Sequence, residues 1–201
     1  MTADFWETIF KRHSIRRYLD RPVSPSVVER ILRAAAHAPS AHNSQPWHFV
    51  VISSPETRVQ LSEKMAEKYE RDMISQGVPA HTIKERVQRS LTLFSQAPVI
   101  IVAFLANKQR GKKEPVNDEN LEGVMDRQSV AVAVGHLLLA ATASGLGACW
   151  YAAPLFCGEI VTRQLGVNPD WEPQALVTLG YPDEVPQPKK KKPLKAVVTH
   201  A

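Results

Sequence analysis

The segment from 127 to 144 restricts the fold most, because it predicts a helix that is apolar almost all round. Its apolar residues are Val130, Ala131, Val132, Val134, Leu137, Leu138, Leu139, Ala140 and Ala141. A helix without a polar face must be covered on every side. In a chain of 201 residues, one way to cover it is to place it in an interface between two subunits. The apolar run is too short to cross a membrane, which takes about 20 apolar residues, so no membrane partner is expected.

The remaining pattern alternates helices with strands. We predict helices at 4–11, 25–38, 55–75, 80–95 and 158–165, and strands at 47–53, 98–104, 148–152 and 174–179. Ser24 is expected to cap the second helix, with a capping box one step on from Ser26 to Glu29. The run at 98–104 is continuously apolar, which is typical of a strand covered on both faces. Strands separated by long helices favour a mixed α/β or α+β layered fold, whose strand order the sequence leaves open. The polar segment 107–120 is predicted to be a loop.

Charge and cysteine content limit the compartment and the partners. The formal net charge is +5, which favours anionic partners, and part of it sits in the lysine run 189–192. Aromatic residues do not interleave with that run, so we expect no nucleic-acid partner. The only cysteines, Cys149 and Cys157, exclude a disulfide scaffold and a cysteine-rich zinc site, and they fit a reducing cytosol. Without a signal-peptide pattern at the N-terminus, a cytoplasmic location is predicted.

Two polar clusters flank the helix predicted at 25–38. The N-terminal cluster, residues 12–17, contains arginines and a serine whose donors suit phosphate or another anion. The alternative is a solvated basic turn. The second cluster, residues 39–43, places Ser40, His42 and Asn43 between a helix and a strand, where they could face a planar heterocycle. The alternative is a loop that satisfies its own backbone.

Several familiar sites are missing from the sequence. Neither GxGxxG nor GxxxxGK[ST] occurs, which argues against a Rossmann dinucleotide site and a P-loop. No GxSxG marks a serine hydrolase. His136 lies on the apolar helix and is interpreted as a core residue in place of a catalyst. No metal site is predicted.

Four segments together resemble the FMN-dependent nitroreductase family. They are Arg-His-Ser-Ile-Arg at 12–16, Pro-Ser-Ala-His-Asn-Ser-Gln-Pro-Trp at 39–47, Leu-Leu-Leu-Ala-Ala at 137–141 with Gly-Leu-Gly-Ala-Cys-Trp at 145–150, and Leu-Gly-Tyr-Pro at 179–182 followed by Pro-Lys-Lys-Lys at 188–191. The order is right and the match covers almost the whole chain. Within the family, residues 145–173 look most like the reductase domain of deazaflavin-coenzyme biosynthesis proteins.

The resemblance implies an α+β fold with a central mixed sheet flanked by helices, in one domain spanning residues 1–201. It also implies an intertwined homodimer with two FMN molecules at the interface, each touched by both subunits. The implied FMN-binding residues are Arg12, His13, Ser14, Arg16, Pro39, Ser40, Asn43, Trp150, Tyr151, Ala152, Ala153, Lys189 and Lys191.

The resemblance also distributes roles among these residues. Arg12, Ser14, Lys189 and Lys191 would lie near the phosphate and ribityl chain, and Arg16 against the N1–O2 edge of the flavin. Pro39, Ser40 and Asn43 would come from the other subunit, and backbone groups of residues 151–153 would approach N5. Lys191 stands where the family often has arginine, and lysine lacks the bidentate fork.

The implied activity is hydride transfer from NADH or NADPH through flavin N5 to a small electron-poor acceptor such as a nitroaromatic or quinone, with ping-pong kinetics. No side chain need then act as a catalytic acid or base. One alternative is a reductase of a dehydrogenated deazaflavin precursor, or another specialised flavin reaction such as reductive dehalogenation. An alternative of another class is a non-catalytic flavin- or anion-binding protein.

Overall fold

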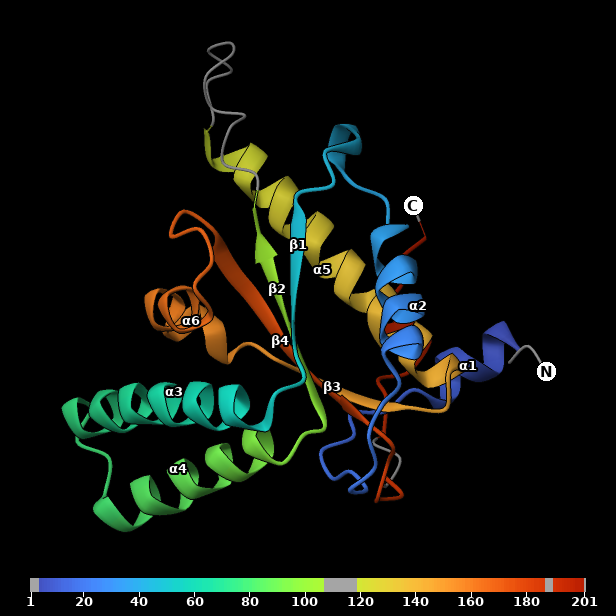
Figure 1. Cartoon of the computed structure of the whole chain (residues 1–201). Coiled ribbons are helices and arrows are strands. Elements are labelled where there is room, and N and C mark those ends of the chain that lie inside the picture. The colour runs from blue at the N-terminus through green and yellow to red at the C-terminus, as the bar shows by residue number, and fades with distance from the viewer. Residues whose placement is uncertain (1–3, 107–118, 187–189, 201) are drawn as a thin grey trace.

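The computed structural model describes residues 4–106, 119–186 and 190–200, with only the backbone of residues 119 and 120 (Figure 1). The helices within these ranges are α1 (Phe5–Lys11), α2 (Pro25–Ala36), α3 (Pro55–Ser75), α4 (Ala80–Ser95), α5 (Glu119–Ala143) and α6 (Gly158–Leu165). The strands are β1 (Trp47–Ile52), β2 (Val99–Leu105), β3 (Gly147–Tyr151) and β4 (Glu172–Gly180). Short 3-10 helices are η1 (Ala41–Asn43), η3 (Ala153–Phe156) and η4 (Leu194–Ala196). The predicted bounds of α3, α4 and α6 are confirmed.

The four strands form one sheet in the order β1-β2-β4-β3, and every neighbouring pair is antiparallel. The prediction of a mixed sheet is therefore wrong for the described strands. The reason lies in the connection between β1 and β2. The α3–α4 hairpin runs out and back, so the chain re-enters the sheet at the end where it left. The only parallel contact among the described residues is an isolated bridge between Ser14 and Ala148.

The helices cover the sheet on both faces (Figure 1). Alternate residues of β2 divide between two cores because side chains along a strand alternate in direction. Val99, Ile101 and Ala103 belong to the core shared with α2 and α5. Ile100, Val102 and Phe104 belong to the core shared with α3 and α6. All seven residues of β2 are buried, which confirms the prediction for this apolar run.

Helix α5 begins at Glu119, eight residues before the predicted start at 127. Leu121, Val124 and Met125 in its first turns have helical spacing, so the predicted start at 127 missed a periodic signal. The predicted loop at 107–120 therefore ends too late, and its residues 107–118 lie outside the described part of the chain. The expectation that α5 is covered on every side also fails for a single chain, because Val132 is 41% exposed.

The start of α2 differs from the predicted capping box. Ser24 is the N-cap residue, but its side chain makes no capping hydrogen bond. Its hydroxyl instead lies 2.9 Å from the Ser26 hydroxyl. Pro25 at the first helical position still defines the start, because its missing N–H needs no partner there. None of the helices in the described ranges combines the length and hydrophobicity needed to span a membrane.

Candidate functional site

The N-terminal cluster, residues 12–17, lies along the outer edge of strand β3. Arg12 caps the end of α1, where its N–H donates to the Thr8 carbonyl. The Ile15 N–H then donates to the Ala148 carbonyl of β3 at 3.0 Å. The contact is close, because a Cβ placed on Gly147 would stand 2.6 Å from Ile15 Cγ2. The edge strand thus fixes the backbone between the arginines.

The chain after β4 holds this segment from its other side. The Glu184 carboxylate accepts a hydrogen bond from the Arg16 N–H at 2.5 Å and lies 3.4 Å from Arg17 Nε. The Leu19 N–H donates to the Tyr181 carbonyl at 2.9 Å. The N-terminal cluster is consequently clasped between β3 and residues 181–184, which are far from it in sequence.

Tyr18 links this clasp, the contact of the N-terminal cluster with residues 181–184, to the core. Its hydroxyl lies 2.6 Å from the Ile15 carbonyl oxygen and 2.7 Å from Thr178 Oγ1 of β4. Burial raises the pKa of the Tyr18 phenol well above its ordinary value, so it stays protonated at neutral pH. The neutral phenol thus links the backbone of residues 14–16 to strand β4 through hydrogen bonds.

Two positive charges in the N-terminal cluster have no counter-ion among the residues that the structure describes. Arg12 and Arg16 are both partly buried. Arg16 Nη1 donates only a long hydrogen bond, 3.4 Å, to the Ser14 carbonyl. Within the described part of the chain neither guanidinium forms an ion pair, whereas Arg17 beside them does. Partly buried cations without a counter-ion favour an anionic ligand.

The predicted N5 segment, residues 151–153, begins at the end of β3, close to Arg16. Trp150 and Tyr151 end β3, and Ala152 leads into η3, which begins at Ala153. Burial raises the pKa of the Tyr151 phenol, and the nearby positive charge of Arg16 opposes that rise. The structure therefore brings Arg16 close to Tyr151 and pairs Ser14 with Ala148 of the same strand. Because this pairing is parallel, Arg12 and His13 lie toward the start of β3, away from residues 151–153.

The second cluster, residues 39–43, lies elsewhere. It forms the turn between α2 and β1, and the Ala41 N–H donates to the Ser129 hydroxyl of α5 at 3.2 Å. Figure 1 shows this turn at the opposite end of α2 from the N-terminal cluster. Twelve helical residues at 1.5 Å each span about 18 Å. Pro39, Ser40 and Asn43 therefore cannot share one pocket with Arg12 and Arg16 in a single chain.

The second cluster has a specific backbone shape. His42, Asn43 and Gln45 all have positive φ, of 53°, 54° and 47°. The Ser40 hydroxyl accepts a hydrogen bond from the Gln45 N–H at 3.0 Å, and Asn43 Oδ1 accepts one from Gln45 Nε2. Part of the cluster thus satisfies its own loop, while the exposed Asn43 keeps its amide N–H groups available.

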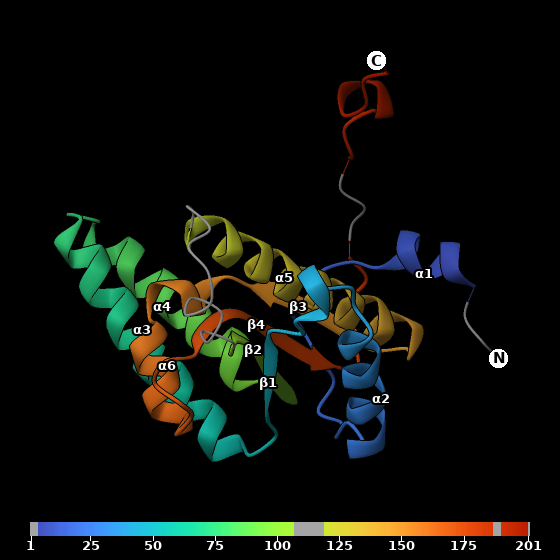
Figure 2. The ribbon, with the colours of Figure 1, turned by 90° about the horizontal axis from the view of Figure 1, so that it is seen from above.

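The C-terminal lysines are not brought to the site within one chain. Lys189 lies outside the described residues. Lys191 is exposed in a segment that projects away from the sheet, as Figure 2 shows for its end at η4.

Sequence reasoning missed Tyr18, Thr178 and Glu184, because contacts across 160 or more positions carry no local signal. His136 Nδ1 lies 3.4 Å from the Ala34 carbonyl oxygen, between α5 and α2 and away from the arginines. Among the described side chains, no group of His, Cys, Asp and Glu could hold a metal ion.

An antiparallel sheet covered by helices defines an α+β protein, and the arginines beside its edge strand, unpaired within the described ranges, suit an anionic ligand. Comparison with known proteins identifies the family. The model of the nitroreductase family matches residues 9–181. The chain belongs to the nitroreductase family.

The relatives extend along nearly the whole chain. An NADH dehydrogenase of Thermus thermophilus is 34% identical over 197 residues, covering 94% of this chain and 91% of the relative. Iodotyrosine deiodinase 1 of Rattus norvegicus is 29% identical over 196 residues, covering 94% of this chain and 67% of the relative. A protein of Desulfovibrio desulfuricans, assigned as a nitroreductase and solved in complex with FMN, superimposes with a TM-score of 0.72 at 26% identity, covering 100% and 98% of the two chains.

Proposed function

We propose that this protein is an FMN-dependent oxidoreductase that passes hydride from NADH or NADPH to a small electron-poor acceptor such as a nitroaromatic or quinone. The observation that carries the proposal is the pair of partly buried arginines beside strand β3, Arg12 and Arg16, which form no ion pair with any described residue. Family membership and the FMN complex of the Desulfovibrio relative support it. The names of the Thermus relative and of the family point to the same chemistry.

The residues present fit FMN. Its phosphate is a dianion, which suits Arg12, Ser14, Lys189 and Lys191 as donors. Arg16 supplies a fixed positive charge for the ring edge that becomes anionic on reduction. The backbone of residues 150–153, fixed by β3 and η3, supplies hydrogen-bonding groups for the other side of the ring. His13 and Trp150 complete the predicted set.

The chemistry divides simply between cofactor and protein. FMN, when bound, accepts and donates hydride at N5. The side chains of the chain position the ring, hold its phosphate and balance its charge. The neutral phenols of Tyr18 and Tyr151, whose pKa values are raised by burial, are not suited to removing protons at neutral pH. This agrees with a reaction that needs no side-chain base.

We propose a homodimer as the working form, because apolar side chains are exposed at several places on the single chain. On α1, Phe5 is 64% and Phe10 73% exposed, and Val132 of the apolar helix α5 is 41% exposed. The C-terminal segment adds Leu194 at 74%. Such exposed apolar residues are typical of subunit interfaces. Their place on the terminal segments suggests that the termini of each subunit pack against the other subunit. A second copy would also bring its own residues 39–43 to the arginines.

Two narrower functions use the same site. Reduction of a dehydrogenated deazaflavin precursor is favoured by the similarity of residues 145–173 to the reductase domain of that pathway. Reductive dehalogenation is favoured by the deiodinase relative. A flavin-binding protein without turnover is the alternative from another class.

The purified protein is expected to be yellow, or to become so on addition of FMN, and to oxidise NADH or NADPH only when an acceptor such as menadione is present. Absorbance between 350 and 500 nm measures flavin, and loss of absorbance at 340 nm measures turnover. A preparation that takes up no FMN contradicts the proposal. Flavin binding without turnover supports the non-catalytic alternative.

Mixed dimers are expected to recover activity that both parent variants have lost. Arg16→Ala and Asn43→Ala each damage both sites of a homodimer. In a heterodimer of the two, one site carries both substitutions and the other carries neither, so about half the wild-type activity should return. Differently tagged chains, refolded together and purified through both tags, provide the measurement.

The outcome distinguishes the two arrangements of the site. If the clusters of one chain served the same flavin, the heterodimer would hold two singly damaged sites and recover nothing. A heterodimer no more active than its parents therefore contradicts a site shared between subunits.

A further inference from the structure

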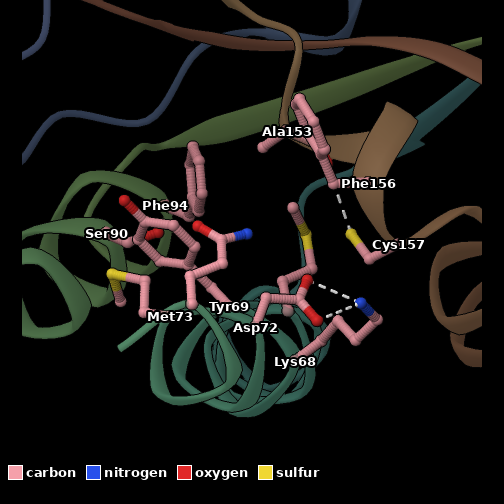
Figure 3. Close-up of a pocket in the computed structure, with 11 residues that line it drawn as sticks. Lys68, Tyr69, Asp72, Met73, Ser90, Phe94, Ala153, Phe156 and Cys157 are labelled. Carbon is pink, nitrogen blue, oxygen red and sulfur yellow. Dashed lines mark hydrogen bonds and ion pairs between the residues drawn. The ribbon is translucent and has the colours of Figure 1, made fainter. Parts of the chain in front are cut away.

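A cavity of about 360 Å³ lies between α3, α4 and η3, outside the arginine site (Figure 3). Its volume falls within the ~300–1,000 Å³ of typical small-molecule sites. The lining is largely apolar: Met65, Met73, Phe94, Phe156 and Cys157 contribute most of its walls. Methionines and aromatic rings together favour planar, polarisable ligands, because thioethers make adaptable contacts with ring edges.

The cavity adjoins the predicted N5 segment. Ala153, the last residue of that segment, is part of the cavity lining. Phe94 of α4 packs edge-to-face on Tyr151, with ring centroids 5.0 Å apart and planes at 87°. A molecule in the cavity is therefore one aromatic layer away from the end of β3. Figure 3 shows Phe94 on one side of the space, and Ala153 and Phe156 on another.

The two charged residues of the cavity lining form one ion pair, and its other polar residues are Tyr69, Gln76 and Ser90. Lys68 Nζ lies 2.5 Å from both carboxylate oxygens of Asp72, one helical turn away on α3. Both side chains are about one-third exposed, at 35% and 36%. Each charge is already neutralised by the other. A charged ligand would have to leave water for an apolar cavity that offers no spare counter-ion, which costs free energy.

Cys157 lies beside the Lys68–Asp72 pair and adds an uncharged surface to that side of the cavity. Burial raises the pKa of its thiol to about 11. The thiol is thus protonated at neutral pH and donates to the Ala153 carbonyl at 3.4 Å. The sulfur is therefore an uncharged, polarisable part of the cavity wall and not a nucleophile.

We propose that this cavity holds the part of the acceptor that extends beyond the flavin, and that the Lys68–Asp72 pair selects uncharged planar acceptors over anionic ones. The ammonium of Lys68 can donate to a carbonyl or nitro oxygen while it remains paired with Asp72. The proposal rests on the proposed function and defines its acceptor more narrowly as an uncharged, one- to three-ring quinone or nitroaromatic.

The test measures binding without turnover, in the oxidised holoprotein and without NADH or NADPH. Isothermal titration calorimetry is run with menadione and with 1,4-naphthoquinone-2-sulfonate, which has the same ring system and one negative charge. Menadione is expected to bind about tenfold more tightly, the effect of a modest desolvation penalty. Equal affinities contradict charge selection.

Two variants with a matched control locate the site. Ser90 of α4 lines the cavity, and Ser90→Trp fills it from a partly buried position; menadione affinity should fall about tenfold or more. Gln88→Trp adds the same side chain on the exposed face of α4 and should leave affinity unchanged. Equal affinity in the Ser90 and Gln88 variants, both folded by circular dichroism, overturns the assignment of the cavity.

A third variant reduces the charge preference. Asp72→Asn leaves Lys68 without its partner, so affinity for the sulfonate should rise several-fold while that for menadione changes little. No gain for the sulfonate contradicts the role of the ion pair. These measurements need no donor and no turnover, so they can fail while the FMN oxidoreductase proposal stands. That proposal is tested separately, by FMN uptake and by acceptor-dependent oxidation of NADH or NADPH.

Discussion

Arg16→Ala is expected to lower the two-electron reduction potential of the bound flavin. The Arg16 guanidinium is partly buried, forms no ion pair in the described part of the chain, and is held by the Glu184 carboxylate through its own backbone N–H. A fixed cation beside a ring that gains negative charge on reduction favours the reduced form. We expect a fall of about 30–60 mV, which for a two-electron couple corresponds to roughly 1.4–2.8 kcal/mol.

Redox titration of the holoprotein with a reference dye measures this change. Arg17→Ala is the matched control, because Arg17 is the next residue and its side chain is 73% exposed and paired with Glu184. The control should leave the potential within a few millivolts. Equal potentials for the wild type and Arg16→Ala would contradict the assigned role.

Gly147→Ala is expected to destabilise the fold and weaken FMN binding together. The new Cβ would stand 2.6–2.8 Å from three side-chain atoms of Ile15, and Ile15 is buried and hydrogen-bonded to β3. Overpacking of a tight contact costs about 1–3 kcal/mol. The displaced backbone carries Ser14 and Arg16, so FMN affinity should fall as well.

Urea denaturation gives the free energy of unfolding, and flavin fluorescence gives the affinity. Gly135→Ala is the control, because its Cβ would meet nothing within 4 Å on helix α5. There the same change should stabilise by about 0.5–1 kcal/mol, the ordinary preference of a helix for alanine over glycine. Similar free energies of unfolding for the Gly147 and Gly135 variants would show that Ile15 can move aside without destabilising the fold.

The sequence predicts most elements because their signals are local. Prolines begin α2 and α3, turn residues separate α3 from α4, and the apolar periodicity between these limits is regular. The start of α5 was placed too late although Leu121, Val124 and Met125 have helical spacing, because polar residues and Gly123 interrupt them. The mixed sheet was implied by the family resemblance, because the residues alone leave strand order and strand direction open; the two helices between β1 and β2 return the chain antiparallel.

The sequence predicted the two polar clusters of the site but not the contacts that hold the N-terminal cluster in place. The two clusters were visible as dense polar segments, and the resemblance supplied roles that remain predictions. The clasp was not visible, because Arg16 meets Glu184 and Tyr18 meets Thr178 across most of the chain. The cavity was hidden for another reason: Met65, Phe94 and Cys157 look like ordinary core residues until three elements leave a space between them.

The placement of the two clusters at opposite ends of α2 has a consequence for handling the protein. If each flavin is held by residues of two chains, cofactor retention depends on protein concentration as well as on FMN concentration, by mass action. Dilution below the dimer dissociation constant would release FMN even from an intact sequence, and excess FMN would in turn hold the chains together. Dimer formation and FMN binding would then be linked, so a change in either would change the other.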